Sequence, residues 1–224
     1  MGAEAGLQLA ALGLLGVWLL LLEGAAKRAA LPRRWGVGAL LWGLFGAAPF
    51  AVALARGKLD SLGLQPGGGV REAVAVLLVA PLAEEALKLA AVAAAQIAGR
   101  AGSARRRFVV GSLAGVGFGA AELAWFSTQS IFAGGSAGAQ ALERALFVVP
   151  MHALATGAGA VLAGPHPGLR LIAGLCAAAA LHWLWNAAIW SGIPAAGSLA
   201  RYVVAATAVA AAVWLAREPR GADR

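Results

Sequence analysis

The chain is built mainly from apolar runs of about 20 residues, which are separated by short polar links. A helix of that length covers about 30 Å, the thickness of the hydrocarbon core of a membrane. Charged residues make up only 12% of the sequence, about half of their share in ordinary soluble domains. The sequence therefore predicts an all-α, polytopic transmembrane helix bundle.

The hydropathy pattern predicts seven spans, at 7–22, 36–55, 71–98, 107–127, 141–163, 169–191 and 198–216. Glu4 is the only charged residue before the first run, so the run lacks the basic leader of a secretory signal. It is expected to be a retained helix. The polar tail, 217–224, is too short for a second domain. We expect one membrane-embedded domain over residues 1–224.

Lysine and arginine residues are concentrated in alternate links between the spans. Cytoplasmic loops carry an excess of these residues, so the asymmetry predicts an N-terminus outside and a C-terminus in the cytoplasm. The net charge of +8 then reports orientation in a lipid bilayer, and no nucleic-acid partner is expected. The predicted cytoplasmic side holds Lys27, Arg28, Arg33, Arg34, Arg100, Arg105, Arg106, Arg107, Arg170, Arg217, Arg220 and Arg224; the other side holds Arg56, Lys58, Arg71, Arg144 and Arg201.

The third to sixth spans contain polar side chains where apolar ones are expected. Each charged side chain at the centre of a membrane helix costs about 2.5 to 3.5 kcal/mol, so such a set indicates a functional site. Because consecutive helices run antiparallel, Glu84, Glu122, His152 and His182 are expected at one depth, within about 10 Å along the bilayer normal. The full set is Glu84, Glu85, Lys88, Glu122, His152, His182 and Asn186.

The spacing of these residues assigns them to helix faces. Glu84 and Lys88 are four residues apart, so the lysine is expected to neutralise Glu84, while Glu85 lies about 100° further round the helix. Two further pairs share this spacing, His182 with Asn186 and Phe118 with Glu122.

Two other features of these spans bear on the site. Pro81 lies three residues before Glu84, and Pro150 lies two residues before His152. Each proline removes a helix hydrogen bond and is expected to bend its helix. Bends beside polar groups in a membrane indicate a water-filled or protein-lined space. Gly111, Gly115 and Gly119 form a four-residue repeat, which predicts a close-packed helix contact.

Three carboxylates, one ammonium and two neutral imidazoles leave a net charge of about −2, so either a carboxylate is protonated or a divalent cation is bound. A zinc site would use Glu122, His152 and His182, with Glu84 or Glu85 as the base. In a metal-free site a carboxylate of Glu84 or Glu85 would polarise the water, and His152 would move protons. His182 and Asn186 would then bind the oxyanion. Both versions remain open from the sequence.

Four motifs in order resemble those of the PrsW family of intramembrane proteases, distant relatives of the type II CAAX endopeptidases and CPBP proteins. They are E-E-A-L-K (84–88), F-G-A-A-E (118–122), His152 and H-W-L-W-N (182–186), within a core of about 70–191. The CAAX relatives have arginine one place later in the first motif and histidine where this chain has Glu122, so prenyl-protein processing is not expected.

The resemblance implies hydrolysis of a peptide bond in or near the membrane, on a transmembrane or membrane-associated protein such as an anti-sigma factor. It implies a bacterial cytoplasmic membrane as the compartment. Glu84 and Glu85 would be the central catalytic pair, with Glu122, His152 and His182 as further catalytic or metal-binding groups and Asn186 as an accessory group. Lys88 and Phe118 would support them.

Two other functions fit the same polar residues. Glutamate, lysine and histidine inside a membrane also mark the ion path of a transporter or a proton relay. A noncatalytic scaffold with this fold is the third hypothesis. Against a transporter, the sequence has no inverted repeat of broken helices.

Overall fold

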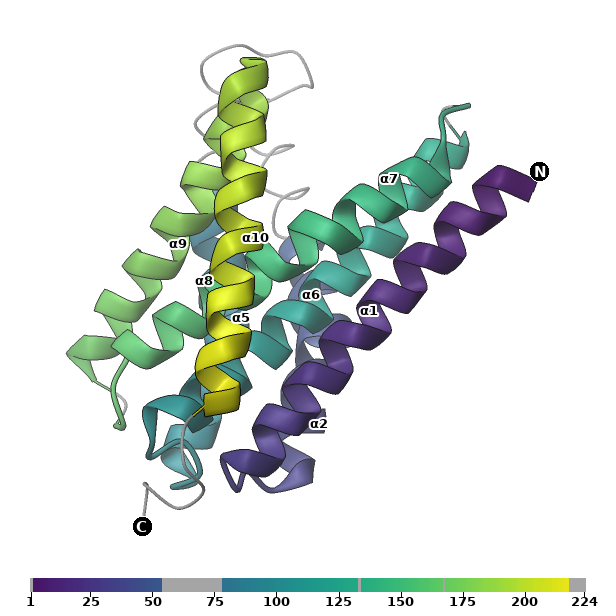
Figure 1. The fold of residues 1–224 in the computed structure, drawn as a ribbon. Helices are drawn as coiled ribbons and strands as arrows, with labels where there is room; N and C mark the ends of the chain where they lie inside the picture. Colours follow the sequence, from purple (N-terminus) through teal and green to yellow (C-terminus); the bar gives the residue numbers. More distant parts are fainter. Residues whose placement is uncertain (1, 54–77, 133, 167, 218–224) are drawn as a thin grey trace.

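The computed structural model describes residues 2–53, 78–132, 134–166 and 168–217, and every regular element among them is helical. Long helices pack into a bundle, and the start of α1 and the end of α10 lie at opposite ends of it (Figure 1). The elements are α1 (Gly2–Arg28), α2 (Arg33–Leu41) with the π-helix η1 (Trp42–Ala47), α5 (Ala80–Ile97), α6 (Ala104–Phe132), α7 (Ala137–Glu143) with the π-helix η3 (Arg144–Val148), α8 (Val149–Leu162), α9 (Leu169–Trp190) and α10 (Pro194–Arg217).

These helices confirm the prediction of an all-α polytopic bundle. Six helical segments of the described chain are long and apolar enough to cross a membrane. The third predicted span appears as α5, whose 18 residues include three charged side chains. Residues 54–55 and 71–77, which the predicted second and third spans include, lie outside the described residues.

Helix α6 lies at the centre of the bundle and packs most closely against α8. A Cβ atom at Gly115 would lie 2.4 Å from the carbonyl oxygen of His152, and one at Gly111 would lie 2.7 Å from that of Thr156. No larger side chain fits at these distances without a shift of backbone. The predicted close contact at Gly111, Gly115 and Gly119, called the glycine seam below, is therefore confirmed. It holds the helix of Glu122 against the helix of His152.

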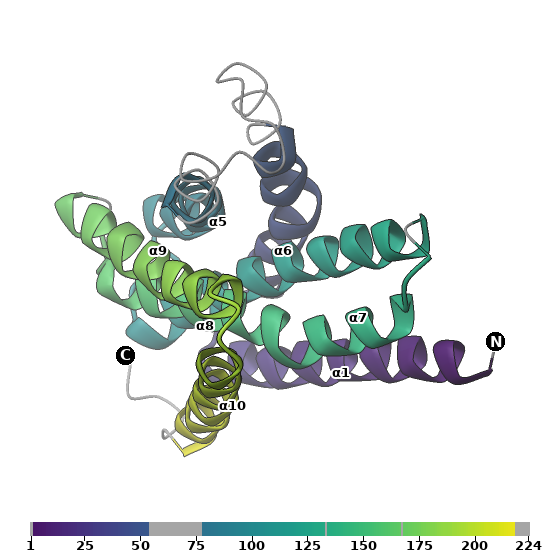
Figure 2. The same ribbon diagram turned by 90° about the horizontal axis from the view of Figure 1, so that it is seen from above.

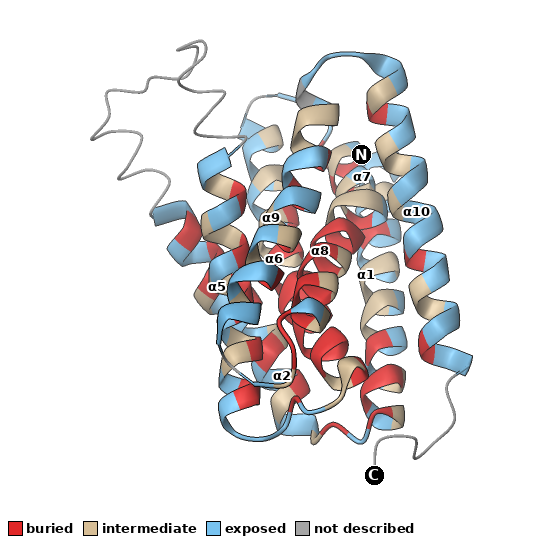
Figure 3. Cartoon of the chain, turned by 90° about the vertical axis from the view of Figure 1, so that its left-hand side faces the viewer, coloured by how far each residue is buried: buried red, intermediate tan, exposed pale blue. Residues whose placement is uncertain are grey.

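Burial decreases from the centre of the bundle to its edge. Most of the first half of α6 and most of α8 are buried, whereas α10 is largely exposed (Figure 3). Viewed from above, α10 stands at the edge of the bundle (Figure 2). Exposed leucine, valine and tryptophan side chains on the outer helices are what a lipid-facing surface requires.

The π-helix η3 lies directly before α8, whose second residue is Pro150. Proline has no N–H to donate to the carbonyl of Leu146, four residues earlier, and α-helical bonding is interrupted there. Two residues of π-helix, 78–79, likewise precede Pro81. The disruption predicted from the two prolines is thus observed beside Glu84 and His152.

Arginine side chains join helix ends on the side of the bundle where α10 ends. Arg28 Nε donates to the carbonyl of Leu215 at 3.1 Å, and Arg105 Nη2 donates to the same carbonyl at 3.0 Å. Arg106 Nε donates to the carbonyl of Ala29 at 2.8 Å. Residues that the sequence analysis interpreted only as orientation signals therefore also tie the C-terminal ends of α1 and α10 to α6.

Candidate active site

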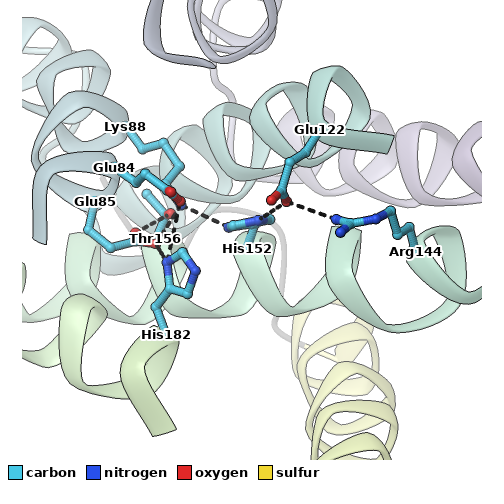
Figure 4. A network of polar contacts seen from close by, with 8 residues as sticks. All are labelled: Glu84, Glu85, Lys88, Glu122, Arg144, His152, Thr156 and His182. Atoms are coloured by element: carbon cyan, nitrogen blue, oxygen red, sulfur yellow. Dashed lines mark hydrogen bonds and ion pairs between the residues drawn. The ribbon is translucent and has the colours of Figure 1, made fainter. Parts of the chain in front are cut away.

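Four helices and η3 bring their polar side chains into one network (Figure 4). The predicted site residues other than Phe118 and Asn186 belong to this network, and two residues that the sequence did not predict join them. Its members are Glu84, Glu85 and Lys88 of α5, Glu122 of α6, Arg144 of η3, His152 and Thr156 of α8, and His182 of α9.

Glu85 is fully buried and both of its carboxylate oxygens accept hydrogen bonds. Oε1 accepts from Lys88 Nζ at 2.5 Å and from His182 Nδ1 at 3.0 Å, and Oε2 accepts from Thr156 Oγ1 at 2.7 Å. The predicted pairing of Lys88 with Glu84 is therefore wrong. Residues three apart on a helix are also neighbours, and only the tertiary packing decides which carboxylate the lysine meets.

Glu84 points from α5 toward the same histidine but is far less constrained. Its Oε2 lies 3.8 Å from His182 Nδ1, beyond hydrogen-bond distance, and this buried oxygen has no hydrogen-bond partner among the described residues. The side chain keeps 20% of its surface exposed. A buried carboxylate oxygen without a partner is costly, which favours a role that brings it a ligand or a proton.

The contacts of the two histidines define which ring nitrogen carries the proton. His152 Nε2 lies 2.9 Å from Glu122 Oε2 and His152 Nδ1 lies 2.9 Å from Lys88 Nζ. Because a carboxylate only accepts and an ammonium only donates, Nε2 is protonated and Nδ1 carries the lone pair. In His182, Nδ1 donates to Glu85, which leaves the lone pair of the neutral ring on Nε2.

Arg144 is a member of the site that the sequence analysis assigned to an outer link. Its Nη1 lies 3.4 Å from Glu122 Oε2, and its guanidinium carbon lies 3.7 Å from the centroid of the Phe126 ring. Three carboxylates then face two cations, which leaves a net charge of about −1 with neutral imidazoles, smaller than the −2 that the sequence predicts. The position of Arg144, three residues inside the fifth predicted span, was the signal for this role.

Thr156 and Phe118 complete the surroundings of Lys88 and His152. Thr156 follows His152 by four residues and so shares its helix face, a signal that the sequence contains. The Phe118 ring centroid lies 4.4 Å from Lys88 Nζ and 5.0 Å from the centroid of the His152 ring. Phe118 therefore packs against both groups, at the position where the sequence predicts a supporting residue.

A cavity of about 530 Å³ adjoins the network and is lined from α5, α6, α7, η3, α8 and α9. Glu84, Glu122, His152 and His182 line it, and Asn186 joins them there one helical turn beyond His182. The space that the prolines and polar residues predict is therefore present. It is large enough for several water molecules beside the carboxylates of Glu84 and Glu122.

Three of the donor groups could hold a metal ion. One ligand atom from each of Glu84, His152 and His182 lies within 4.8 Å of the others. Two histidines and a carboxylate are a usual zinc set, and each imidazole has a carboxylate on one of its ring nitrogens, as metal-binding histidines commonly do. This group differs from the predicted set in one member, because Glu122 is bound to His152 and Glu84 has the free oxygen.

Comparison with known families gives a match over most of the chain. The family model described as PrsW family intramembrane metalloprotease matches residues 31–215. No curated protein and no solved structure was found to match. The match confirms the resemblance that four short motifs suggest, and it extends beyond them to nearly the whole helical bundle.

Proposed function

The chain belongs to the PrsW family of intramembrane metalloproteases, and from this premise we propose that it hydrolyses a peptide bond of a membrane-spanning protein in or near the bilayer. The observation that carries the proposal is the partnerless oxygen of Glu84, which lies beside two histidines whose other nitrogens are held by carboxylates. The cavity beside this group supplies room for water and for a peptide.

We assign the metal ligands to Glu84, His152 and His182, with His152 Nδ1 and His182 Nε2 as the nitrogens that carry lone pairs. A zinc ion bound there would lower the pKa of a bound water and polarise the scissile carbonyl. Lys88 now donates to His152 Nδ1 at 2.9 Å, so metal binding requires the ammonium to move to Glu85 alone.

The remaining polar groups then have separate tasks. Glu85 orients the His182 ring, and Glu122 orients the His152 ring while Arg144 steadies its carboxylate. Glu122 also faces the cavity, where its carboxylate accepts a proton from the attacking water. The amide of Asn186 donates to the carbonyl oxygen of the substrate as negative charge develops on it.

The proposed substrate class is supported by the family resemblance and by the place of the site among helices that could cross the membrane. A protein with a single apolar span, such as a membrane-anchored regulator of the anti-sigma-factor type, is the partner that the family resemblance favours. We place the enzyme in a bacterial cytoplasmic membrane on the same ground.

The test is cleavage of a panel of single-span proteins in vesicles that contain the purified, zinc-loaded enzyme. Glu84→Gln is expected to lower kcat/KM at least 100-fold. Glu23→Gln is the matched control, because Glu23 also lies on a helix beside a lysine, 3.0 Å from Lys27, but on the exposed surface of α1. Equal activity of Glu84→Gln and wild type, in well-folded proteins, would refute the assignment.

Metal analysis addresses the mechanism separately. About one zinc per chain is expected in wild type, with loss in Glu84→Gln, His152→Ala and His182→Ala and weaker binding in Glu122→Gln. Activity in fully metal-free protein would favour the version in which the carboxylates and histidines act alone.

A further inference from the structure

A second cavity, of about 700 Å³, lies between α8, α9 and α10. Its lining is apolar apart from Thr207, whose hydroxyl donates to the carbonyl of Val203 within α10 at 2.7 Å. The α10 residues that line it recur every three or four positions from Ala196 to Trp214, a stripe of about 27 Å along the helix. This groove between α8, α9 and α10 is therefore about as long as the hydrocarbon core is thick.

Helix α10 is tied to the bundle near its two ends. Arg201 pairs with Glu143 at one end. At the other end Trp214 packs edge-on against Phe108, with ring centroids 5.5 Å apart, and Leu215 accepts bonds from two arginines. Ala200 and Val204 pack against the buried cluster of Met151, Ala155 and Trp185, whereas the neighbouring groove-lining Val203 remains 54% exposed.

Two side chains separate this groove from the cavity of the candidate active site. Met151 and Trp185 line both cavities and are themselves buried. Met151 directly precedes His152, and Trp185 lies one helical turn after His182. A methionine side chain adapts its shape easily, so a small rearrangement of this pair would join the apolar groove to the polar site.

We propose that the groove between α8, α9 and α10 binds the apolar membrane-spanning segment of the protein substrate, which reaches the site when Met151 and Trp185 move apart. The proposal rests on the proposed protease function. A spanning helix hides its peptide bonds in its own hydrogen bonds, so the segment must unwind where other polar groups can satisfy them. The cavity with Glu84 and Asn186 is the adjoining place that offers such groups.

A peptide is favoured over a lipid acyl chain because the groove continues into a site with hydrogen-bonding groups. An acyl chain has no polar group along its length to place there. The groove alone would accept either occupant, so the experiments distinguish them by what contacts α10.

The first experiment compares two substitutions on α10. Ala200→Leu fills the groove, whereas Ala206→Leu adds the same side chain on an exposed position that does not line it. For a single-span protein that wild type cleaves in vesicles, kcat/KM should fall at least tenfold in Ala200→Leu and stay within twofold in Ala206→Leu. Zinc content should be unchanged in both. Equal kinetics of the two variants would overturn the proposal.

The second experiment does not depend on cleavage. A photoreactive p-benzoylphenylalanine replaces Val203, which lines the groove, or Val209, an exposed valine of α10 that does not. The probe is a biotin-labelled peptide of 20 alternating leucine and alanine residues with lysine ends, in phosphatidylethanolamine and phosphatidylglycerol vesicles with the Glu84→Gln enzyme. Peptide adducts should be at least fivefold more abundant at position 203.

Equal labelling at the two positions, or adducts with phospholipid only at position 203, would overturn the groove assignment. The outcomes for the groove and for the protease function are separable. If wild type cleaves no member of the panel while the peptide still labels position 203, the protease function fails and the binding groove stands.

Discussion

The α6–α8 pair and helix α10 are built on opposite principles, although both cross the same membrane. In the α6–α8 pair, glycine lets two backbones touch and polar side chains are closed into a network. Helix α10 supplies no side chain to that network and faces an open groove along much of its length. Under the proposed function, the groups that act on the peptide bond are held in a fixed geometry, while the groove that would receive the substrate has no such constraint.

The largest expected difference concerns ion pairs. Lys88→Met leaves the buried carboxylate of Glu85 without its cation and should lower the free energy of unfolding by about 3 to 5 kcal/mol. Arg201→Met breaks the partly exposed pair with Glu143 on α10 and should cost about 0 to 1 kcal/mol. Denaturant titration of both variants in mixed micelles measures the two values. Similar losses would mean that α10 is as firmly packed as the core.

A second comparison tests the glycine seam. Gly115→Ala places a methyl group 2.4 Å from the carbonyl oxygen of His152 and should cost about 1 to 3 kcal/mol. In Gly197→Ala, on α10, the new methyl group would meet nothing closer than Arg201 Nη1, at 3.4 Å. Thermal unfolding in detergent should show a clear decrease of Tm for the first variant and little change for the second. A stable Gly115→Ala protein with full activity would contradict the seam.

The smallest expected difference comes from two threonines. Thr156→Val removes the hydroxyl that donates to buried Glu85 and should cost about 1 to 2 kcal/mol. Thr207→Val removes a hydroxyl that bonds only to the carbonyl of its own helix, and the change should stay within about 0.5 kcal/mol. The same denaturant titration applies. A larger loss of unfolding free energy for Thr207→Val than for Thr156→Val would contradict this prediction.

The sequence is enough to predict the helical bundle and to predict that the polar residues of four helices lie at one depth. Runs of apolar residues define spans because the hydrocarbon core has a fixed thickness, and charges inside such runs are too costly to be incidental. For that reason Glu84, Glu122, His152 and His182 could be expected at one depth before their contacts were known.

The partners of these residues could not be predicted in the same way. Lys88 can reach either glutamate along its own helix, and only the position of α8 and α9 shows that Thr156 and His182 also bind Glu85. The role of Arg144 depends on a π-helix whose bounds the sequence does not give. The groove along α10 depends on how closely α10 packs against α8 and α9, which no residue pattern reports.

The π-helix η3 has a consequence for the permitted length of this segment of the chain. A π-turn accommodates one residue more than the α-helical turn it replaces, and each residue turns an α-helix by about 100°. A regular α-helix over the same residues would instead rotate the side chains before the turn by about 100° relative to those after it. Arg144 would then leave the face it shares with His152, so this site depends on a residue count as well as on residue types.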